Sequence, residues 1–367
     1  MKDAIVMKER YVFLDFMKVF SIFSVCFYHY NNLNIDILNH SSVLTYFNYF
    51  MKGIASTGVP LFFMVNGVLM LNRTYSLRKL IIRILKIILI VLIWGILTLL
   101  LLMIIEGRQY SPLSFVRALW HWEVNTVNHL WFLQTLVCIY MIFPVLKLIY
   151  DQEDKMIRLY FLGLLFLFTF GNVLIYMIVN IGEFMIGVNF LKKPEFNFFN
   201  QFNPFRGLRA YSVIYFMSGA LILRNLKENP KIHSKRWIFL IIVGLILLGF
   251  YGIIMSHSNQ ALFDTVFRGY DSMMTLGMTI GIFILSYLGR YSLNSFASVL
   301  TLIGQNTLGI FLVHRMVGSY LKRYFVHWIL SSYLVTNLCF AAIVMAVSLG
   351  IVLLLKRIPV INLLFQI

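Results

Sequence analysis

Residues 87–105 read IILIVLIWGILTLLLLMII, nineteen positions without a charged side chain. Such a run is long enough to cross the hydrocarbon core of a bilayer as a helix, which takes about 20 residues. The strands of an outer-membrane barrel would instead alternate apolar and polar side chains over short segments of about ten residues. This segment therefore predicts a helical membrane protein.

The composition of the whole chain agrees with that prediction. Of its 367 residues, 60% are hydrophobic and 12% are charged, about half the charged share of roughly 25% in soluble domains. The 34 phenylalanines and 20 tyrosines exclude a disordered chain. A net charge of +17 would suggest nucleic acid in a soluble protein, but membrane proteins carry such an excess in cytoplasmic loops and against anionic lipids. We therefore expect membrane lipids as partners and no nucleic acid.

Ten apolar segments are candidate spans, which predicts an all-α membrane bundle. An N-terminus in the cytoplasm places the larger share of the lysines and arginines on the cytoplasmic side, so we expect both termini there. The first segment contains charged residues and lacks a small-residue cleavage site, so we expect a retained span and not a signal peptide. Residues 1–367 are then a single multi-pass domain with no soluble domain. The expected spans are 11–30, 53–71, 80–104, 130–149, 159–180, 210–224, 237–255, 266–288, 295–317 and 333–355.

The first expected span carries three ionisable residues, Asp15, Lys18 and His29. Asp15 and Lys18 are three positions apart, so they share a helical face and can neutralise each other. His29 follows Lys18 by eleven positions, close to three turns, so it lies on the same face roughly 16 Å further along. Ionisable groups inside a bilayer are costly and mark functional sites. The alternatives are a Lys18 that reaches the headgroups and an interfacial His29.

Polar side chains also gather in three later apolar segments and one outer loop. Asn66 and two glycines in GVPLFFMVNG (58–67) suggest close helix approach or a bent backbone. The stretch HLWFLQ (129–134) begins a span with hydrogen-bonding groups, although an aromatic belt is an alternative. His314 is by itself more typical of a structural histidine. The candidate site residues in these segments are Asn66, Trp122, His129, Trp131, Gln134 and His314, with Glu123 in the outer loop.

Arginines gather at the cytoplasmic end of the second and third spans, at Arg73, Arg78 and Arg83. Guanidinium groups suit phosphate oxygens, although a cluster here also satisfies the positive-inside bias. We expect no metal, because no group of His, Cys, Asp or Glu has ligand spacing and the three cysteines all lie in apolar runs.

Together these segments resemble the acyltransferase-3 family, the multi-pass membrane acyltransferases of bacterial surface sugars. Asp15 and Lys18 followed by His29 look like the family's Arg/Lys-x10-His motif, and GVPLFFMVNG is similar to its G-V-x-L-F-F-x-x-S-G segment. The other matches, in chain order, are LRKLIIRI (77–84), HLWFL (129–133) with YMIFP (140–144), YFMSG (215–219) and IGQNTLGIFLVH (303–314). Lys18 replaces the commoner arginine, Asn66 and Thr307 replace serines, and we expect no extracellular esterase-like domain of the kind that some members carry.

The resemblance implies an O-acetyltransferase in a bacterial plasma membrane, which moves an acyl group from cytoplasmic acetyl-CoA, or another acyl-CoA, to a hydroxyl of an extracytoplasmic glycan or lipid-linked sugar. His29 would act as base or as transient acyl carrier. Lys18, positioned by Asp15, would hold the pantetheine or pyrophosphate arm or stabilise developing negative charge, and the arginine cluster would bind the phosphates. Glu123 would orient His29 or bind sugar, and the other candidate residues would bind the substrate: Asn66, Trp122, His129, Trp131, Gln134 and His314. A polysaccharide exporter or flippase-like protein without CoA chemistry is the alternative, and a sensor that has lost the chemistry is a third. Neither needs the Lys18/His29 pair beside an arginine cluster.

Overall fold

The computed structural model describes residues 11–31, 33–40, 42–120, 127–187, 203, 209–229, 233–325 and 333–365. Throughout these ranges the regular structure is helical and contains no strand. Eight helical segments in them are long and apolar enough to cross a membrane. The all-α membrane bundle is therefore confirmed, whereas the count of ten spans and the cytoplasmic termini stay predictions.

Most of the described residues lie in α-helices. In chain order they are α1 (Val12–His29), α2 (Val43–Gly53), α3 (Gly58–Leu71), α4 (Leu77–Glu106), α5 (Pro112–Trp120), α6 (Trp131–Asp151), α7 (Lys155–Phe166), α8 (Asn172–Ile186), α10 (Tyr211–Glu228), α11 (Ser234–Asn259), α12 (Met273–Leu288), α14 (Ala297–Lys322) and α16 (Leu334–Leu355), with the short α13 (Arg290–Leu293) and α17 (Pro359–Asn362).

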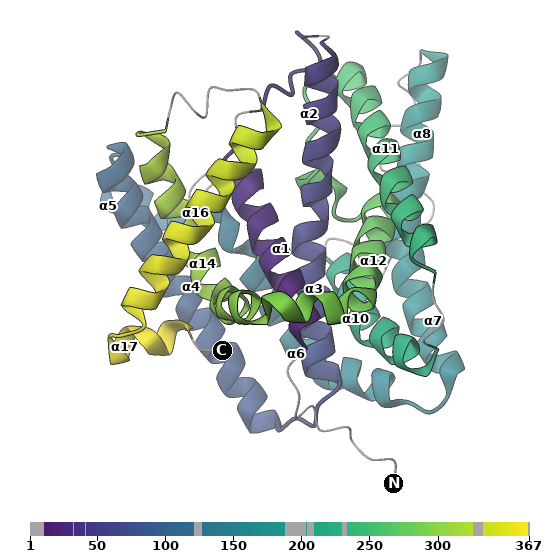
Figure 1. The fold of residues 1–367 in the computed structure, drawn as a ribbon, viewed down its shortest axis with the longest axis horizontal. Helices are drawn as coiled ribbons and strands as arrows, with labels where there is room; N and C mark the ends of the chain where they lie inside the picture. Colours follow the sequence, from purple (N-terminus) through teal and green to yellow (C-terminus); the bar gives the residue numbers. More distant parts are fainter. Residues whose placement is uncertain are drawn as a thin grey trace.

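Helix α1 is the central element of the bundle. It packs against α3, α12, α14 and α16, and Figure 1 shows it near the middle, with α4, α5 and α16 on one side and α7, α8 and α11 on the other. Protein therefore surrounds α1 on several sides. The end of the bundle where α1 begins is termed the Tyr11 end, and the opposite end the His29 end.

Helices α3 and α10 pack with their backbones in contact. A Cβ added to Gly67 would overlap the carbonyl oxygen of Phe216, and one added to Gly219 would overlap the carbonyl oxygen of Met64. Such small-residue contacts are typical of helices that associate in membranes. The close helix approach predicted for residues 58–67 is thus confirmed.

The second span begins ten residues earlier than expected. Helix α2, the 3-10 turn Ile54–Thr57 and α3 form one helical segment from Val43 to Leu71. The Ser42 side chain begins it by accepting the backbone N–H of Thr45 at 3.1 Å, a typical N-cap. The start was missed because α2 has one polar face, which interrupts the apolar run used to find spans.

The expected span 266–288 begins as a turn, and α12 itself begins only at Met273. The Asp264 carboxylate accepts the backbone N–H groups of Val266 and Phe267, at 3.0 and 3.4 Å, which holds the chain in a turn. Ser272 then caps α12 by accepting from Thr275 N at 3.2 Å. With 16 residues, α12 is shorter than the roughly 20 that cross a bilayer.

Candidate active site

Three histidine rings lie together toward the His29 end of the bundle. His29 ends α1, His129 lies in the 3-10 turn that leads into α6, and His314 lies in the last third of α14. The His314 ring centroid is 5.5 Å from that of His29 and 5.6 Å from that of His129. His129 and His314 are buried. The fold thus gathers residues from three distant segments into what is termed the histidine cluster (His29, His129 and His314).

Arg315 joins this cluster through His29. Its Nη1 lies 3.3 Å from His29 Nδ1, and because a guanidinium only donates, the imidazole lone pair at Nδ1 accepts this bond. The Tyr30 hydroxyl donates to the Arg315 carbonyl oxygen, which ties α14 to the end of α1. Arg315 was not among the candidate residues expected from the sequence. Its position directly after His314 in an apolar helical run was the available signal.

The orientation of the His314 ring follows from its own helix. Its Nδ1 lies 2.6 Å from the Phe311 carbonyl oxygen, three residues earlier in α14. A carbonyl oxygen only accepts, so Nδ1 carries the proton and Nε2 carries the lone pair. This Nε2 is buried and has no hydrogen-bond partner among the residues that the structure describes. His314 therefore presents an acceptor nitrogen within the histidine cluster.

A cavity of about 530 Å³ lies between α1, α3, α4, α6 and α14. Its lining includes four cationic side chains, and none of the described residues that line it is an aspartate or glutamate. It is termed the cationic cavity. Its charged lining residues are Lys18, Arg73, Lys79 and Arg83.

The cationic cavity extends to within one aromatic ring of the histidine cluster. Phe62, Phe132 and Phe311 line it, and the Phe311 ring centroid lies 5.6 Å from that of Phe132. The same Phe311 ring lies 5.7 Å from the His314 ring and 6.0 Å from the His129 ring. Phe311 thus contacts both the cavity and the cluster.

Asp15 holds Lys18 at the wall of the cationic cavity. The Lys18 ammonium lies 3.2 Å from Asp15 Oδ1, and Asp15 is buried behind it. The Thr301 hydroxyl donates to Asp15 Oδ2 at 3.5 Å, and the absence of a side chain at Gly304 makes room for the carboxylate. The predicted Asp15–Lys18 pair is thus formed, with Lys18 facing the cavity and Asp15 outside its lining.

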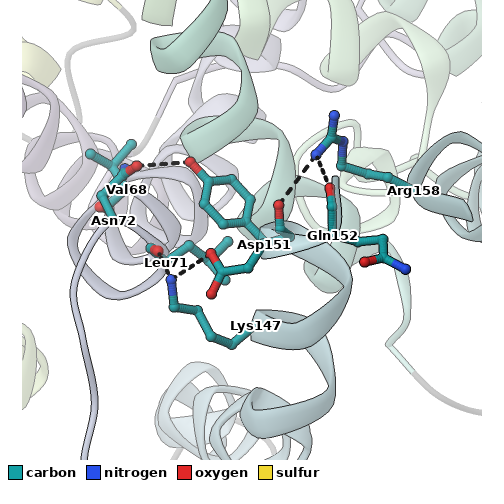
Figure 2. Close-up of polar contacts among 8 residues, drawn as sticks. Val68, Leu71, Asn72, Lys147, Asp151, Gln152 and Arg158 are labelled. Carbon is teal, nitrogen blue, oxygen red and sulfur yellow. Dashed lines mark hydrogen bonds and ion pairs between the residues drawn. The ribbon is translucent and has the colours of Figure 1, made fainter. Parts of the chain in front are cut away.

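The loop that carries Arg73 is anchored to the end of α6 (Figure 2). The Tyr150 hydroxyl donates to Asn72 Oδ1 at 2.8 Å, directly before Arg73. The Lys147 ammonium donates to the Leu71 carbonyl oxygen at 2.7 Å and pairs with Asp151 at 2.7 Å. These contacts fix the end of α3 and therefore the start of the loop 72–76, which carries Arg73.

Asn66, which was expected to bind substrate, and Arg78, which was expected to bind the donor, lie in different environments. Asn66 lines the cationic cavity, where its Oδ1 accepts from the Tyr140 hydroxyl at 3.4 Å. Arg78 is exposed and does not line the cavity, whereas its neighbour Lys79 does. Lys79 is the lining cation that sequence reasoning left out of its candidates.

Toward the His29 end, the Trp131 ring contacts the Arg209 guanidinium and the Tyr270 ring. The Arg209 guanidinium lies 4.6 Å from the Trp131 ring centroid, and the Tyr270 ring lies 5.7 Å from it. Gln134 is half-buried on α6 and does not line the cationic cavity. Trp122 and Glu123 lie outside the described residues.

A family model described as an acyltransferase domain matches residues 11–357, nearly the whole chain. The chain belongs to this acyltransferase-3 family. It is therefore a multi-pass membrane acyltransferase, which acts on an acyl donor and an acceptor. No curated protein and no solved structure matches the chain. In the described part of the chain, no group of three or more His, Cys, Asp or Glu side chains is arranged to hold a metal ion.

Proposed function

We propose that this acyltransferase moves an acetyl group from cytoplasmic acetyl-CoA to a hydroxyl of an extracytoplasmic glycan or lipid-linked sugar. The Tyr11 end faces the cytoplasm in this proposal, in a bacterial plasma membrane. The observation that supports it is the cationic cavity and its extension to the histidine cluster. A donor can then bind at one end and react at the other.

The charge of the cationic cavity suits the donor. Acetyl-CoA carries a pyrophosphate and a ribose phosphate at one end and the reactive thioester at the end of a neutral pantetheine arm. Arg73, Lys79 and Arg83 supply guanidinium and ammonium donors for phosphate oxygens. Lys18 lies deeper along α1, held by Asp15, where it can contact the pyrophosphate or the pantetheine amides. The thioester would then approach Phe311 and the cluster behind it.

The histidine cluster suits the transfer step. The acceptor oxygen forms a bond to the acyl carbon, the carbon–sulfur bond of the thioester breaks, and the hydroxyl proton passes through an imidazole to the departing sulfur. General acid–base catalysis by a positioned histidine contributes about 10²–10⁴-fold. The Trp131 and Tyr270 rings with Arg209 offer stacking and hydrogen-bonding groups to an approaching sugar.

Thermal unfolding of the purified protein tests the donor assignment. A ligand that binds the folded state raises the melting temperature by mass action. We expect acetyl-CoA to stabilise the wild type and His29→Gln, and to stabilise Arg83→Ala less. S-acetyl-pantetheine, which has the thioester and no phosphate, should stabilise the wild type less than acetyl-CoA at equal concentration. No stabilisation by any acyl-CoA would contradict the proposal and favour the exporter.

A further inference from the structure

His29 and His314 differ in the hydrogen-bonding role of the ring nitrogen Nε2. Arg315 donates to His29 Nδ1, so a neutral His29 carries its proton on Nε2 and is a donor there. His314 is the reverse, because its Nδ1 proton bonds to the Phe311 carbonyl oxygen and its Nε2 holds a lone pair. One ring therefore offers an N–H and the other offers an acceptor, with centroids 5.5 Å apart.

We propose that His314 Nε2 is the general base that takes the proton from the acceptor hydroxyl, and that His29 Nε2–H, backed by Arg315, stabilises the oxyanion. This assignment rests on the proposed acyl transfer and divides its chemistry between two residues. A base or carrier role for His29 would need a lone pair, and in this geometry that lone pair faces Arg315.

The buried state of His314 Nε2 supports this assignment. A buried acceptor without a hydrogen bond is destabilising, and none of the described residues supplies a donor to this nitrogen. A reacting hydroxyl is a ligand that would satisfy it. Phe311 links this acceptor to the donor, because its ring lines the cationic cavity and its carbonyl oxygen sets the His314 tautomer.

The proposed step balances in atoms and protons. The acceptor hydroxyl proton moves to His314 Nε2 as the oxygen forms its bond to the acyl carbon. The carbonyl oxygen gains negative charge, which His29 Nε2–H stabilises as an oxyanion hole does. The carbon–sulfur bond then breaks, and His314 Nε2 returns the proton to the CoA sulfur. The products are the acyl ester and free CoA thiol.

The tautomer assignment can be tested without any substrate. Solid-state NMR of the full chain in lipid bilayers, labelled with ¹³C,¹⁵N-histidine, distinguishes the ring nitrogens, because Nε2 is bonded to Cδ2 and Nδ1 is not. The eight histidines are assigned by difference spectra of single variants. For His314 we expect the non-protonated ring nitrogen to correlate with Cδ2, which identifies it as Nε2. For His29 we expect the protonated ring nitrogen to correlate with Cδ2. A protonated Nε2 on His314 overturns the proposal.

The base role is tested with two acceptors in His314→Asn, whose amide N–H can replace Nδ1–H toward the Phe311 carbonyl. Water attack on acetyl-CoA, measured as acetate release, needs a base, whereas hydroxylamine attacks as a neutral amine and forms a hydroxamate. We expect acetate release to fall about 10²–10⁴-fold and hydroxamate formation to change less than about tenfold. Parallel losses of both products would assign His314 a structural role and overturn the proposal.

His29→Asn is the matched comparison, because loss of an oxyanion donor slows both acceptors, by about 10²–10³-fold. A selective loss of acetate release in His29→Asn, with His314→Asn unaffected, would reverse the two roles and overturn the proposal. A wild type that forms neither product contradicts the acyl transfer itself, and the NMR measurement then still decides the tautomer of His314.

Discussion

The histidine cluster and the cationic cavity are separated by one aromatic ring, yet they are built differently. The cluster consists of side chains at the ends and in the interior of packed helices, two of them buried. The cavity owes its charge to Lys18 in α1, to a loop and to the start of α4, and its lysines and arginines face open volume. In the proposed function, packed helices hold the reacting groups, whereas long lysine and arginine side chains bind the phosphates of the donor. Substitutions in the two regions should therefore separate chemistry from donor binding.

The largest expected effect is on the rate, from the histidine cluster. His29→Asn should reduce acyl transfer by about 10²–10³-fold, as expected for loss of an oxyanion donor, and leave the Kd of acetyl-CoA near the wild-type value, because His29 does not line the cationic cavity. Steady-state rates and isothermal titration with acetyl-CoA measure the two quantities. A higher Kd for acetyl-CoA with an unchanged turnover number would contradict the assignment of chemistry to the histidine cluster and of donor binding to the cationic cavity.

The next effect is on donor affinity, from the cationic cavity. Arg83→Ala removes a lining guanidinium, and a hydrogen bond to a charged group contributes about 1.5–3 kcal/mol, or about 10–150-fold in Kd. Arg78→Ala is the matched control, because Arg78 lies five residues earlier on the same helix and outside the lining. Equal losses in the two variants would show that general positive charge, and not the cavity, binds the donor.

The smallest effect, on the KM for acetyl-CoA, should come from the hydrogen bond that anchors the loop 72–76. Tyr150→Phe removes the hydrogen bond to Asn72, which is one neutral bond of about 0.5–1.5 kcal/mol. We expect the KM for acetyl-CoA to rise by about 2–10-fold and the turnover number to stay unchanged. A fall in turnover without a change in KM would place the effect of this anchor on the chemistry and contradict the division.

The sequence was most informative where spacing along one helix decides the outcome. Asp15, Lys18 and His29 share a face of α1 because eleven residues are close to three turns, and the Asp15–Lys18 pair forms as expected. The membrane bundle followed from apolar runs because lipid imposes helices.

The sequence was less informative where neighbouring helices decide which side chain faces inward. Arg78 and Lys79 differ by one position, which is about 100° around the helix, and packing of α4 turns Lys79 into the cavity. The contact between Arg315 and His29 joins residues 286 positions apart. The local pattern marks Arg315 as an ionisable residue in an apolar run, but it does not specify His29 as the partner. The turn before α12 depends on one side chain, Asp264, which an average over hydropathy does not weigh.

A structure of the protein with bound coenzyme A, determined by cryo-electron microscopy in a lipid nanodisc, tests the central claim most directly. The account predicts phosphates against Arg73, Lys79 and Arg83, and a pantetheine arm that passes Lys18 and brings its sulfur beside Phe311, next to the histidine cluster. Coenzyme A bound away from the cationic cavity, or with its phosphates at the His29 end, would contradict the account.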